Sequence, residues 1–156
     1  MIVTATEADG SQIQSITARA GVFSQEEIDS VSVMWREYLT LGPEDSGYHF
    51  IVDRDGDRVL GFAIYGPRDL TDGAFDLYWI SVDPAAQCNG VGRALLTASE
   101  NAARKMGGRM LIAETSGTSL YEPARKFYFS MGYENEATIK DFYTIGDDLK
   151  IFIKRI

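Results

Sequence analysis

The residues best suited to chemistry lie in one short segment, Gln87-Cys88-Asn89-Gly90-Val91-Gly92-Arg93. It follows a strand-like run that Asp83-Pro84 ends, and it leads into a helical pattern. Glycine has no Cβ, so the backbone can approach a ligand closely. The first N–H groups of a helix lack internal partners and lie at the positive end of its dipole. The segment therefore predicts an anion site suited to a pyrophosphate, although a tight turn without a ligand would also use these glycines.

Three nucleotide-binding patterns can be compared with this segment. A P-loop needs Gly-Lys-Ser/Thr after its glycines, whereas the sequence has Gly92-Arg93-Ala94, so that pattern fails. A dinucleotide fingerprint, G-x-G-x-x-G/A, has Leu95 at its last position, and the expected strand ends about eight residues too early. Glu114 nevertheless lies where a ribose-binding acid belongs, so a nicotinamide enzyme stays open as a rival.

The third pattern, Q/R-x-x-G-x-G/A, matches at Gln87, Gly90 and Gly92. A second signature lies downstream, where residues 124–133, ARKFYFSMGY, fit A-x-x-F/L-Y-x-x-x-G-F/Y. The two signatures in this order resemble the GNAT superfamily of N-acetyltransferases. The resemblance covers nearly the whole chain, because the order of the expected elements also agrees.

The resemblance implies an acetyltransferase that uses acetyl-CoA as co-substrate and transfers the acetyl group directly to an amine. It implies that the strand from Ile80 to Val82 leaves main-chain groups free for the pantetheine arm. The turn would hold the pyrophosphate through backbone amides, with Gln87 orienting it, and an N–H near Val82 would stabilise the oxyanion. No metal is implied, because Cys88 and His49 are isolated and form no ligand cluster.

The resemblance also implies a catalytic acid and a catalytic base. Tyr128 matches the tyrosine that protonates the departing thiolate, a task that suits a phenol with an ordinary pKa near 10. Glu114 matches the glutamate that some members use as base, and Glu122 and Asp76 are lesser candidates. The residues alone leave two alternatives open, in which Tyr128 is a core tyrosine and Glu114 a surface carboxylate.

Two features depart from the family pattern. Many members carry asparagine seven residues before the catalytic tyrosine, where this chain has Tyr121. The stretch from Glu114 to Tyr128 also looks about two residues longer than in some amino-terminal acetyltransferases, which weakens any transfer of peptide specificity.

Cys88 stands inside the turn, either as an oxidation-sensitive thiol or as a variable position that contributes only its amide.

Periodicity predicts the elements that must position these residues. We expect helices at 8–20, 24–41, 90–106 and 121–131, and strands at 1–5, 48–52, 59–65, 74–82, 109–114, 133–139 and 142–154. A tight turn is expected at Gly146-Asp147-Asp148. The order β-α-α-β-β-β-α-β-α-β-β predicts a mixed-sheet α/β (α+β) fold, and the resemblance adds a mostly antiparallel, splayed sheet flanked by helices.

Aromatic residues are expected in two places. Phe127, Phe129 and Tyr133 are expected in the core. In this family the N-terminal helices and the closing hairpin determine the acceptor, and six aromatic residues there either line a site or belong to the core. They are Trp35, Tyr38, Tyr78, Trp79, Phe142 and Tyr143.

Composition limits the classes of function. The 156 residues fit one domain, 1–156, and a net charge of −8 disfavours nucleic-acid and membrane-surface binding while suiting a cationic amine acceptor. One cysteine, no signal peptide and no apolar membrane span predict a cytoplasmic enzyme. The resemblance makes a homodimer an expectation. A non-catalytic CoA-binding sensor or interaction domain of the same fold is the main alternative.

Overall fold

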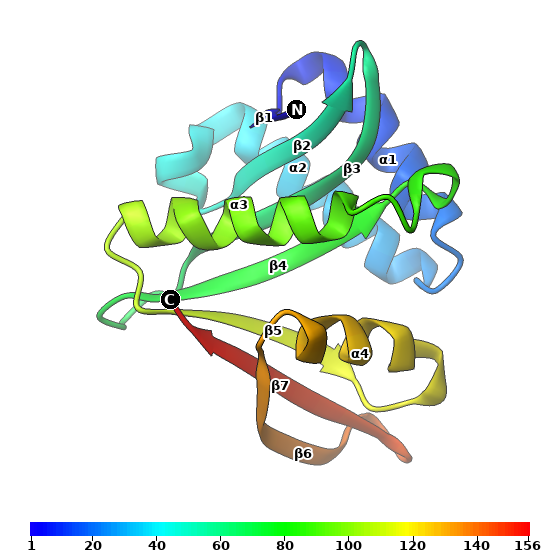
Figure 1. Cartoon of the computed structure of the whole chain (residues 1–156), viewed down its shortest axis with the longest axis vertical. Coiled ribbons are helices and arrows are strands. Elements are labelled where there is room, and N and C mark those ends of the chain that lie inside the picture. Colours follow the sequence, from blue (N-terminus) through cyan, green and yellow to red (C-terminus); the bar gives the residue numbers. More distant parts are fainter.

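The computed structural model describes residues 1–156, and its helices and strands follow the expected order (Figure 1). Short 3-10 helices precede α1, α3 and α4: η1 Glu7–Asp9, η2 Pro84–Ala86 and η3 Ser119–Tyr121. The strands are β1 Ile2–Thr4, β2 His49–Asp55, β3 Arg58–Pro67, β4 Ala74–Val82, β5 Met110–Ser116, β6 Glu134–Thr144 and β7 Asp147–Arg155. The helices are α1 Gly10–Arg19, α2 Gln25–Ser46, α3 Val91–Lys105 and α4 Glu122–Ser130.

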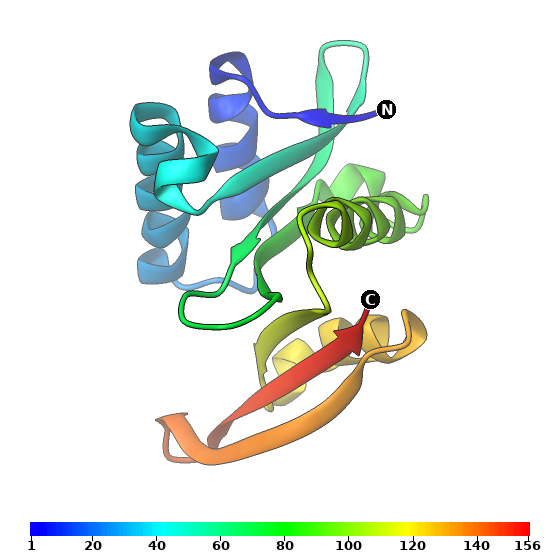
Figure 2. The ribbon, with the colours of Figure 1, turned by 90° about the vertical axis from the view of Figure 1, so that its left-hand side faces the viewer.

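The strands form one seven-stranded sheet in the order β1-β2-β3-β4-β5-β7-β6. All neighbouring strands are antiparallel except β4 and β5, which are parallel and are connected through α3. Helices α1 and α2 cover one face of the sheet, and α3 and α4 cover the other (Figures 1 and 2). The predicted fold class, a mostly antiparallel mixed sheet flanked by helices, is confirmed.

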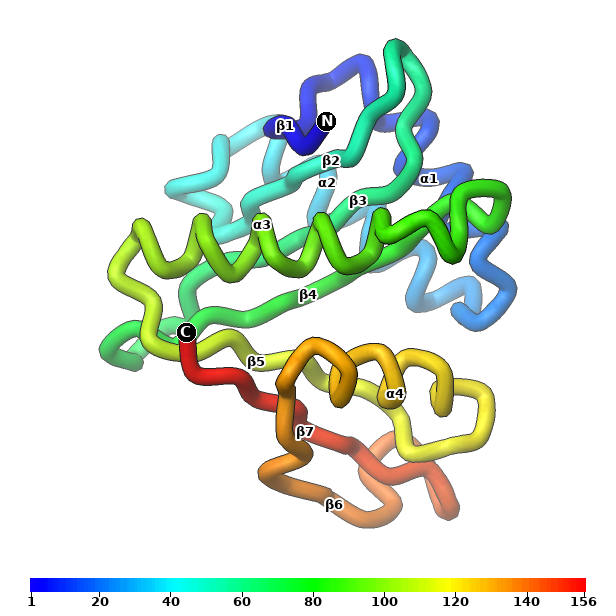
Figure 3. The backbone as a smooth tube through the Cα atoms, viewed as in Figure 1, coloured from blue at the N-terminus to red at the C-terminus, as the bar shows by residue number.

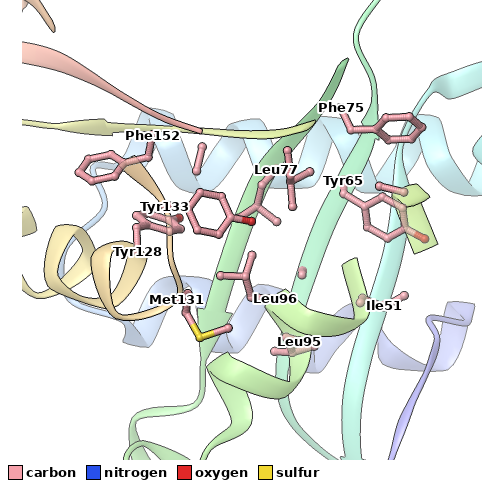
Figure 4. Close-up of a cluster of buried hydrophobic side chains, with 14 of the residues drawn as sticks. Ile51, Tyr65, Phe75, Leu77, Leu95, Leu96, Tyr128, Met131, Tyr133 and Phe152 are labelled. Carbon is pink, nitrogen blue, oxygen red and sulfur yellow. The ribbon is translucent and has the colours of Figure 1, made fainter. Parts of the chain in front are cut away.

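Each face of the sheet has its own hydrophobic cluster. On the α3–α4 face, Leu95 and Leu96 of α3 lie with Phe152 of β7 (Figure 4), and Leu111 of β5 belongs to the same cluster. On the α1–α2 face, the aromatic rings of Trp35, Tyr38 and Phe50 lie together among buried aliphatic side chains. Because side chains alternate between the faces of a strand, these clusters show which face each strand residue occupies.

Two predicted boundaries were wrong. The first strand of the final hairpin runs through Phe142 to Thr144, and the tight turn lies at Ile145-Gly146, so Asp147 and Asp148 belong to β7. Asp141 adopts a left-handed conformation, φ 53°, in the irregular part of the β6–β7 ladder between Ile139 and Thr144. Helix α2 continues beyond Leu41 to Ser46, across a kink at Gly42-Pro43.

Candidate functional site

Strands β4 and β5 lie side by side only along their first residues. Their ladder runs from the Ala74–Met110 pair to the Leu77–Ala113 pair and then stops. On its other edge β4 stays paired with β3 as far as Val82, with a bulge at Tyr78. A bulge bends its strand, and beyond Tyr78 strands β4 and β5 diverge, so that the two halves of the sheet separate into a V (Figure 1).

The backbone of β4 beyond the bulge carries polar groups with no partner strand. N–H directions alternate along a strand, and the N–H of Asp83 donates to Leu60 O of β3 over 2.8 Å. The N–H groups of Ile80 and Val82 therefore point away from β3, toward the open side of the V. No residue of β5 pairs with them there.

The turn between β4 and α3 adds further free N–H groups, and Figure 3 traces the backbone through it. Cys88 and Gly90 are both left-handed, with φ 65° and φ 79°, and Gly90 caps α3. The first backbone bond of the helix runs from Ala94 N to Gly90 O. The N–H groups of Val91, Gly92 and Arg93 therefore lack helical partners, at the positive end of the helix dipole.

The other residues of the turn are constrained by backbone conformation, by a hydrogen bond or by packing. Gln87 is extended, and Asn89 Nδ2 donates to Ala86 O over 3.4 Å. A Cβ added at Gly92 would lie 3.6 Å from Phe127 and Val82, which is an ordinary contact. Gly90 is needed for its left-handed backbone, whereas the protein packing alone does not require glycine at position 92.

Buried Asp83 holds the start of the turn. Its carboxylate accepts the N–H of Ala85 over 3.0 Å and the guanidinium groups of Arg19 and Arg58 over 3.1 and 3.2 Å. The Ala85 N–H and these two arginines hold the pKa of Asp83 below its ordinary value. Asp83 thereby ties the turn to α1 and β3.

Tyr128 lies on α4, on the same face of the sheet as α3. Its ring packs 5.6 Å from the rings of Tyr133 and Phe152, centroid to centroid, and burial raises its pKa above the ordinary value. The buried side-chain polar atoms that lack a partner are Arg54 Nε and Trp79 Nε1, and the Tyr128 hydroxyl is not among them. Tyr128 is thus a core residue of which only 7% is exposed.

Glu114 is the first residue of β5 beyond the ladder with β4. Leu111 and Ala113 face the α3–α4 cluster, so Glu114 points to the opposite face. Its Oε1 accepts a hydrogen bond from Arg68 Nη2 over 3.2 Å. Arg68 also binds both carboxylate oxygens of Asp76, with a shortest distance of 2.7 Å. Glu114 and Asp76 line an open hollow of about 150 Å³ with Tyr78 and Ile112.

A splayed strand that leads into a helix start with free amides is the geometry that the first sequence signature implies. The family model for the acetyltransferase (GNAT) domain matches residues 45–135, which is more than half of the chain. The chain belongs to the GNAT acetyltransferase family. The match contains both signatures, at residues 87–92 and 124–133.

Individual relatives agree with this assignment. A solved GNAT-family structure from Desulfovibrio desulfuricans is 38% identical, with a TM-score of 0.96, covering 99% of this chain and 98% of that one. The ribosomal protein bS18-alanine N-acetyltransferase of Haemophilus ducreyi is 28% identical over 94% of this chain and 91% of its own length. The ribosomal-protein-alanine N-acetyltransferase of Brucella melitensis is 24% identical and shares the fold, with a TM-score of 0.78 over 100% and 99% of the two chains.

In this GNAT domain some of the predicted residues do not lie at the opening. Trp35 and Tyr38 belong to the core on the α1–α2 face, because they pack against Phe50 beneath the helices. Phe129, which was predicted in the core, is more than half exposed, although its ring packs edge-on against Phe152 of β7 at a centroid distance of 5.0 Å. Tyr133 is buried as predicted, and its hydroxyl donates to Glu100 over 3.1 Å.

The lesser candidates for a catalytic base are placed less favourably than Glu114. Glu122 lies on the exposed surface of α4 and pairs with Lys126 one turn later. Asp76 has both oxygens bound by Arg68. His49 stacks on Tyr65, and burial lowers its pKa.

No helix is long and apolar enough to cross a membrane, and no three His, Cys, Asp or Glu side chains gather as metal ligands would.

Sequence reasoning missed three site residues. Asp83 was interpreted only as a strand breaker, although Asp-Pro before a short helix is also a capping signal. Arg68 gave no local signal, since its partner Glu114 lies 46 residues away. Tyr121 was noticed only as a departure from the family, and its contact with Glu27 spans 94 residues.

Proposed function

We propose that this GNAT acetyltransferase moves the acetyl group of acetyl-CoA directly to a primary amine, and that the open edge of β4 holds the donor. The proposal rests on one continuous run of backbone N–H groups that have no partner in the chain. The free N–H groups of Ile80 and Val82 lead into a turn whose helix start favours an anion. An extended arm that ends in a pyrophosphate matches both parts.

The residues present fit acetyl-CoA. The backbone amides from Cys88 to Arg93 would hold the pyrophosphate, and the exposed Arg93 side chain would add positive charge. The pantetheine arm would lie along β4 as an added strand, using the main-chain groups of Ile80 and Val82. When bound, acetyl-CoA supplies an electrophilic thioester carbonyl, whose oxygen an N–H of β4 near Val82 would stabilise.

The acid and the base lie on opposite faces of the sheet. Tyr128 belongs to the α3–α4 face, and the Glu114 side chain points to the α1–α2 face. Donor and amine would therefore meet within the opening of the V. The Tyr128 hydroxyl, whose pKa is raised by burial, is protonated at neutral pH and would give its proton to the departing thiolate sulfur.

Glu114 is the proposed base. Arg68 occupies its Oε1, which fixes the carboxylate while leaving Oε2 without a partner in the chain. An acceptor ammonium must lose a proton before its nitrogen can attack, and Oε2 would take that proton directly or through a water molecule. The ion pair with Arg68 thus orients a carboxylate whose second oxygen faces solvent.

The acceptor class follows from charge. A chain with net charge −8 attracts cations, and acidic side chains stand at the opening, including Glu114 and Asp76. Two of the relatives act on the alanine of a ribosomal protein by their names, so the amino terminus of a peptide is the first acceptor to try. We propose the cytoplasm as the place of action, in keeping with one free cysteine.

An acceptor screen tests the proposal. Purified protein is incubated with acetyl-CoA and, separately, an alanine-initiated hexapeptide, Nα-blocked lysine and spermidine, and products are analysed by mass spectrometry. We expect a gain of one acetyl group on at least one amine, and loss of that product with Tyr128→Phe. Tight CoA binding without turnover across a wide amine panel would favour the non-catalytic domain. A thermal shift with NAD and none with CoA would contradict the donor assignment.

A further inference from the structure

Tyr121 connects the two halves of the sheet at the open end of the V. It ends η3, directly after β5, and therefore belongs to the C-terminal half. Its hydroxyl lies 3.2 Å from Val22 O and 3.2 Å from Glu27 Oε1, in and beside the loop between α1 and α2. Burial and the neighbouring Glu27 carboxylate raise the pKa of Tyr121 to about 12, so the hydroxyl stays a donor.

The loop that Tyr121 holds is fixed from the other side as well. The ring of Phe23 lies 4.4 Å from that of Trp79, centroid to centroid, and Trp79 is on the stretch of β4 that β5 does not pair with. Residues 20–24, which we call the strap, therefore reach from β4 to η3. They cross the opening on the α1–α2 face, the face toward which Glu114 points.

Glu27 couples the strap to helix α2. Its Oε2 accepts the N–H of Ser24 over 2.7 Å in a capping box at the start of the helix. Its Oε1 shares the single proton of the Tyr121 hydroxyl with Val22 O, each acceptor at 3.2 Å. One carboxylate thus joins the end of the strap, the first turn of α2 and η3. Losing the Tyr121 hydroxyl would release η3 while leaving the cap of α2 in place.

Two side-chain links bracket the opening on this face. Arg68, in the loop directly after β3, pairs with Glu114 of β5 near the vertex of the V, over 3.2 Å. Tyr121 joins η3 to the strap at the far end. An amine that approaches from the α1–α2 face must pass between these links, so the placement of the strap sets the width of its path.

We propose that Tyr121 is a positioning residue for the acceptor: its hydroxyl holds the strap across the acceptor side of the V and thereby sets how the amine enters. This rests on the proposed function above. It assigns Tyr121 to the acceptor side, although the family pattern has an asparagine at this position. Tyr121→Phe keeps the ring and removes only the link.

The experiment has one arm that needs no turnover. Hydrogen exchange of the amides of residues 20–28 is measured in the wild type, in Tyr121→Phe and in Tyr38→Phe. The last removes a hydroxyl bond to Ala5 O in the core beneath α2 and serves as the matched control. We expect exchange of these amides to be about threefold to tenfold faster in Tyr121→Phe alone, as for the loss of one net hydrogen bond. Wild-type exchange in Tyr121→Phe would overturn the proposal.

The second arm uses steady-state kinetics with the alanine-initiated hexapeptide or spermidine, whichever supports turnover. In Tyr121→Phe the KM for that amine should rise about threefold to tenfold, with KM for acetyl-CoA and kcat within twofold of wild type. A KM for acetyl-CoA that rises as much as the amine KM would place Tyr121 on the donor side and contradict the proposal. If no amine is turned over, the exchange arm still decides, so its failure is distinct from that of the proposed function.

Discussion

Tyr78 and Glu114 are the residues that immediately follow the last pair of the β4–β5 ladder, Leu77–Ala113. One is the bulge that bends β4 away, and the other is the first carboxylate of β5 beyond the junction. The vertex of the V and the proposed base therefore coincide. The backbone irregularity that opens the sheet also exposes the carboxylate beside the opening, in the hollow that both residues line.

Replacing Glu114 with glutamine should lower kcat/KM for the amine about 100-fold at pH 7, because the amide cannot accept the ammonium proton. The loss should shrink as the pH approaches the pKa of the amine, since more acceptor is then already deprotonated. A pH profile of kcat/KM for both proteins measures this. Glu134→Gln, at an exposed site on β6, is the matched control and should follow the wild-type profile. An equal loss at every pH would rule out proton abstraction by Glu114.

Replacing Tyr128 with phenylalanine should lower kcat about 100-fold and leave the Kd for CoA within twofold, because only the proton donor is lost. Burial raises the Tyr128 pKa, so the hydroxyl stays protonated past the ordinary tyrosine value near 10. The wild-type kcat should therefore show no alkaline decline from this group between pH 8 and 10. Tyr133→Phe, which loses a buried hydrogen bond to Glu100, separates packing effects from chemistry. In Tyr133→Phe the free energy of unfolding should fall, while kcat should stay close to the wild-type value.

The fold was predictable from the sequence to the extent that local patterns determine it. Periodicity and glycine positions gave the order of elements, and β4 was predicted with its observed ends, Ala74 and Val82. The final hairpin was misplaced because β6 runs through an irregular stretch that contains a left-handed Asp141, and no local pattern predicts that conformation. The contacts that build the site join distant segments: Arg68 to Glu114, and Tyr121 to Glu27. Such pairs depend on the folded topology, and a single sequence does not reveal them.

The two glycines of the turn should respond differently to alanine. Gly90 has φ 79°, where a Cβ costs roughly 1–2 kcal/mol, so Gly90→Ala should lower the free energy of unfolding by about that amount and weaken CoA binding. Gly92 has ordinary room for a Cβ, so Gly92→Ala should stay within about 0.5 kcal/mol of wild type. Urea unfolding and calorimetric CoA titration measure both effects. A larger loss of stability in Gly92→Ala than in Gly90→Ala would contradict this account of the turn.

The charge of Asp83 should stabilise the fold in a pH-dependent way. The N–H of Ala85, together with Arg58 and Arg19, lowers its pKa in the folded state, so its contribution is present above the unfolded value, near 3.9, and is lost as the pH falls through the folded value. Asp83→Asn keeps an oxygen for the Ala85 N–H but loses both ion pairs. It should reduce the free energy of unfolding by about 1–2 kcal/mol at pH 7.

The difference between Asp83→Asn and the wild type should begin to narrow below pH 4, because the unfolded wild-type chain then binds a proton at this carboxyl, and it should close as the pH falls through the lowered pKa of the folded carboxyl. Urea titrations at pH 7, 5 and 3.5 measure it. Asp45→Asn replaces an exposed aspartate on α2 and should track the wild type at each pH. A gap that stays constant from pH 7 to 3.5 would mean that Asp83 acts through shape and hydrogen bonding. In that case the two arginines would not anchor the turn by charge, and their neutral replacement would leave CoA binding unchanged.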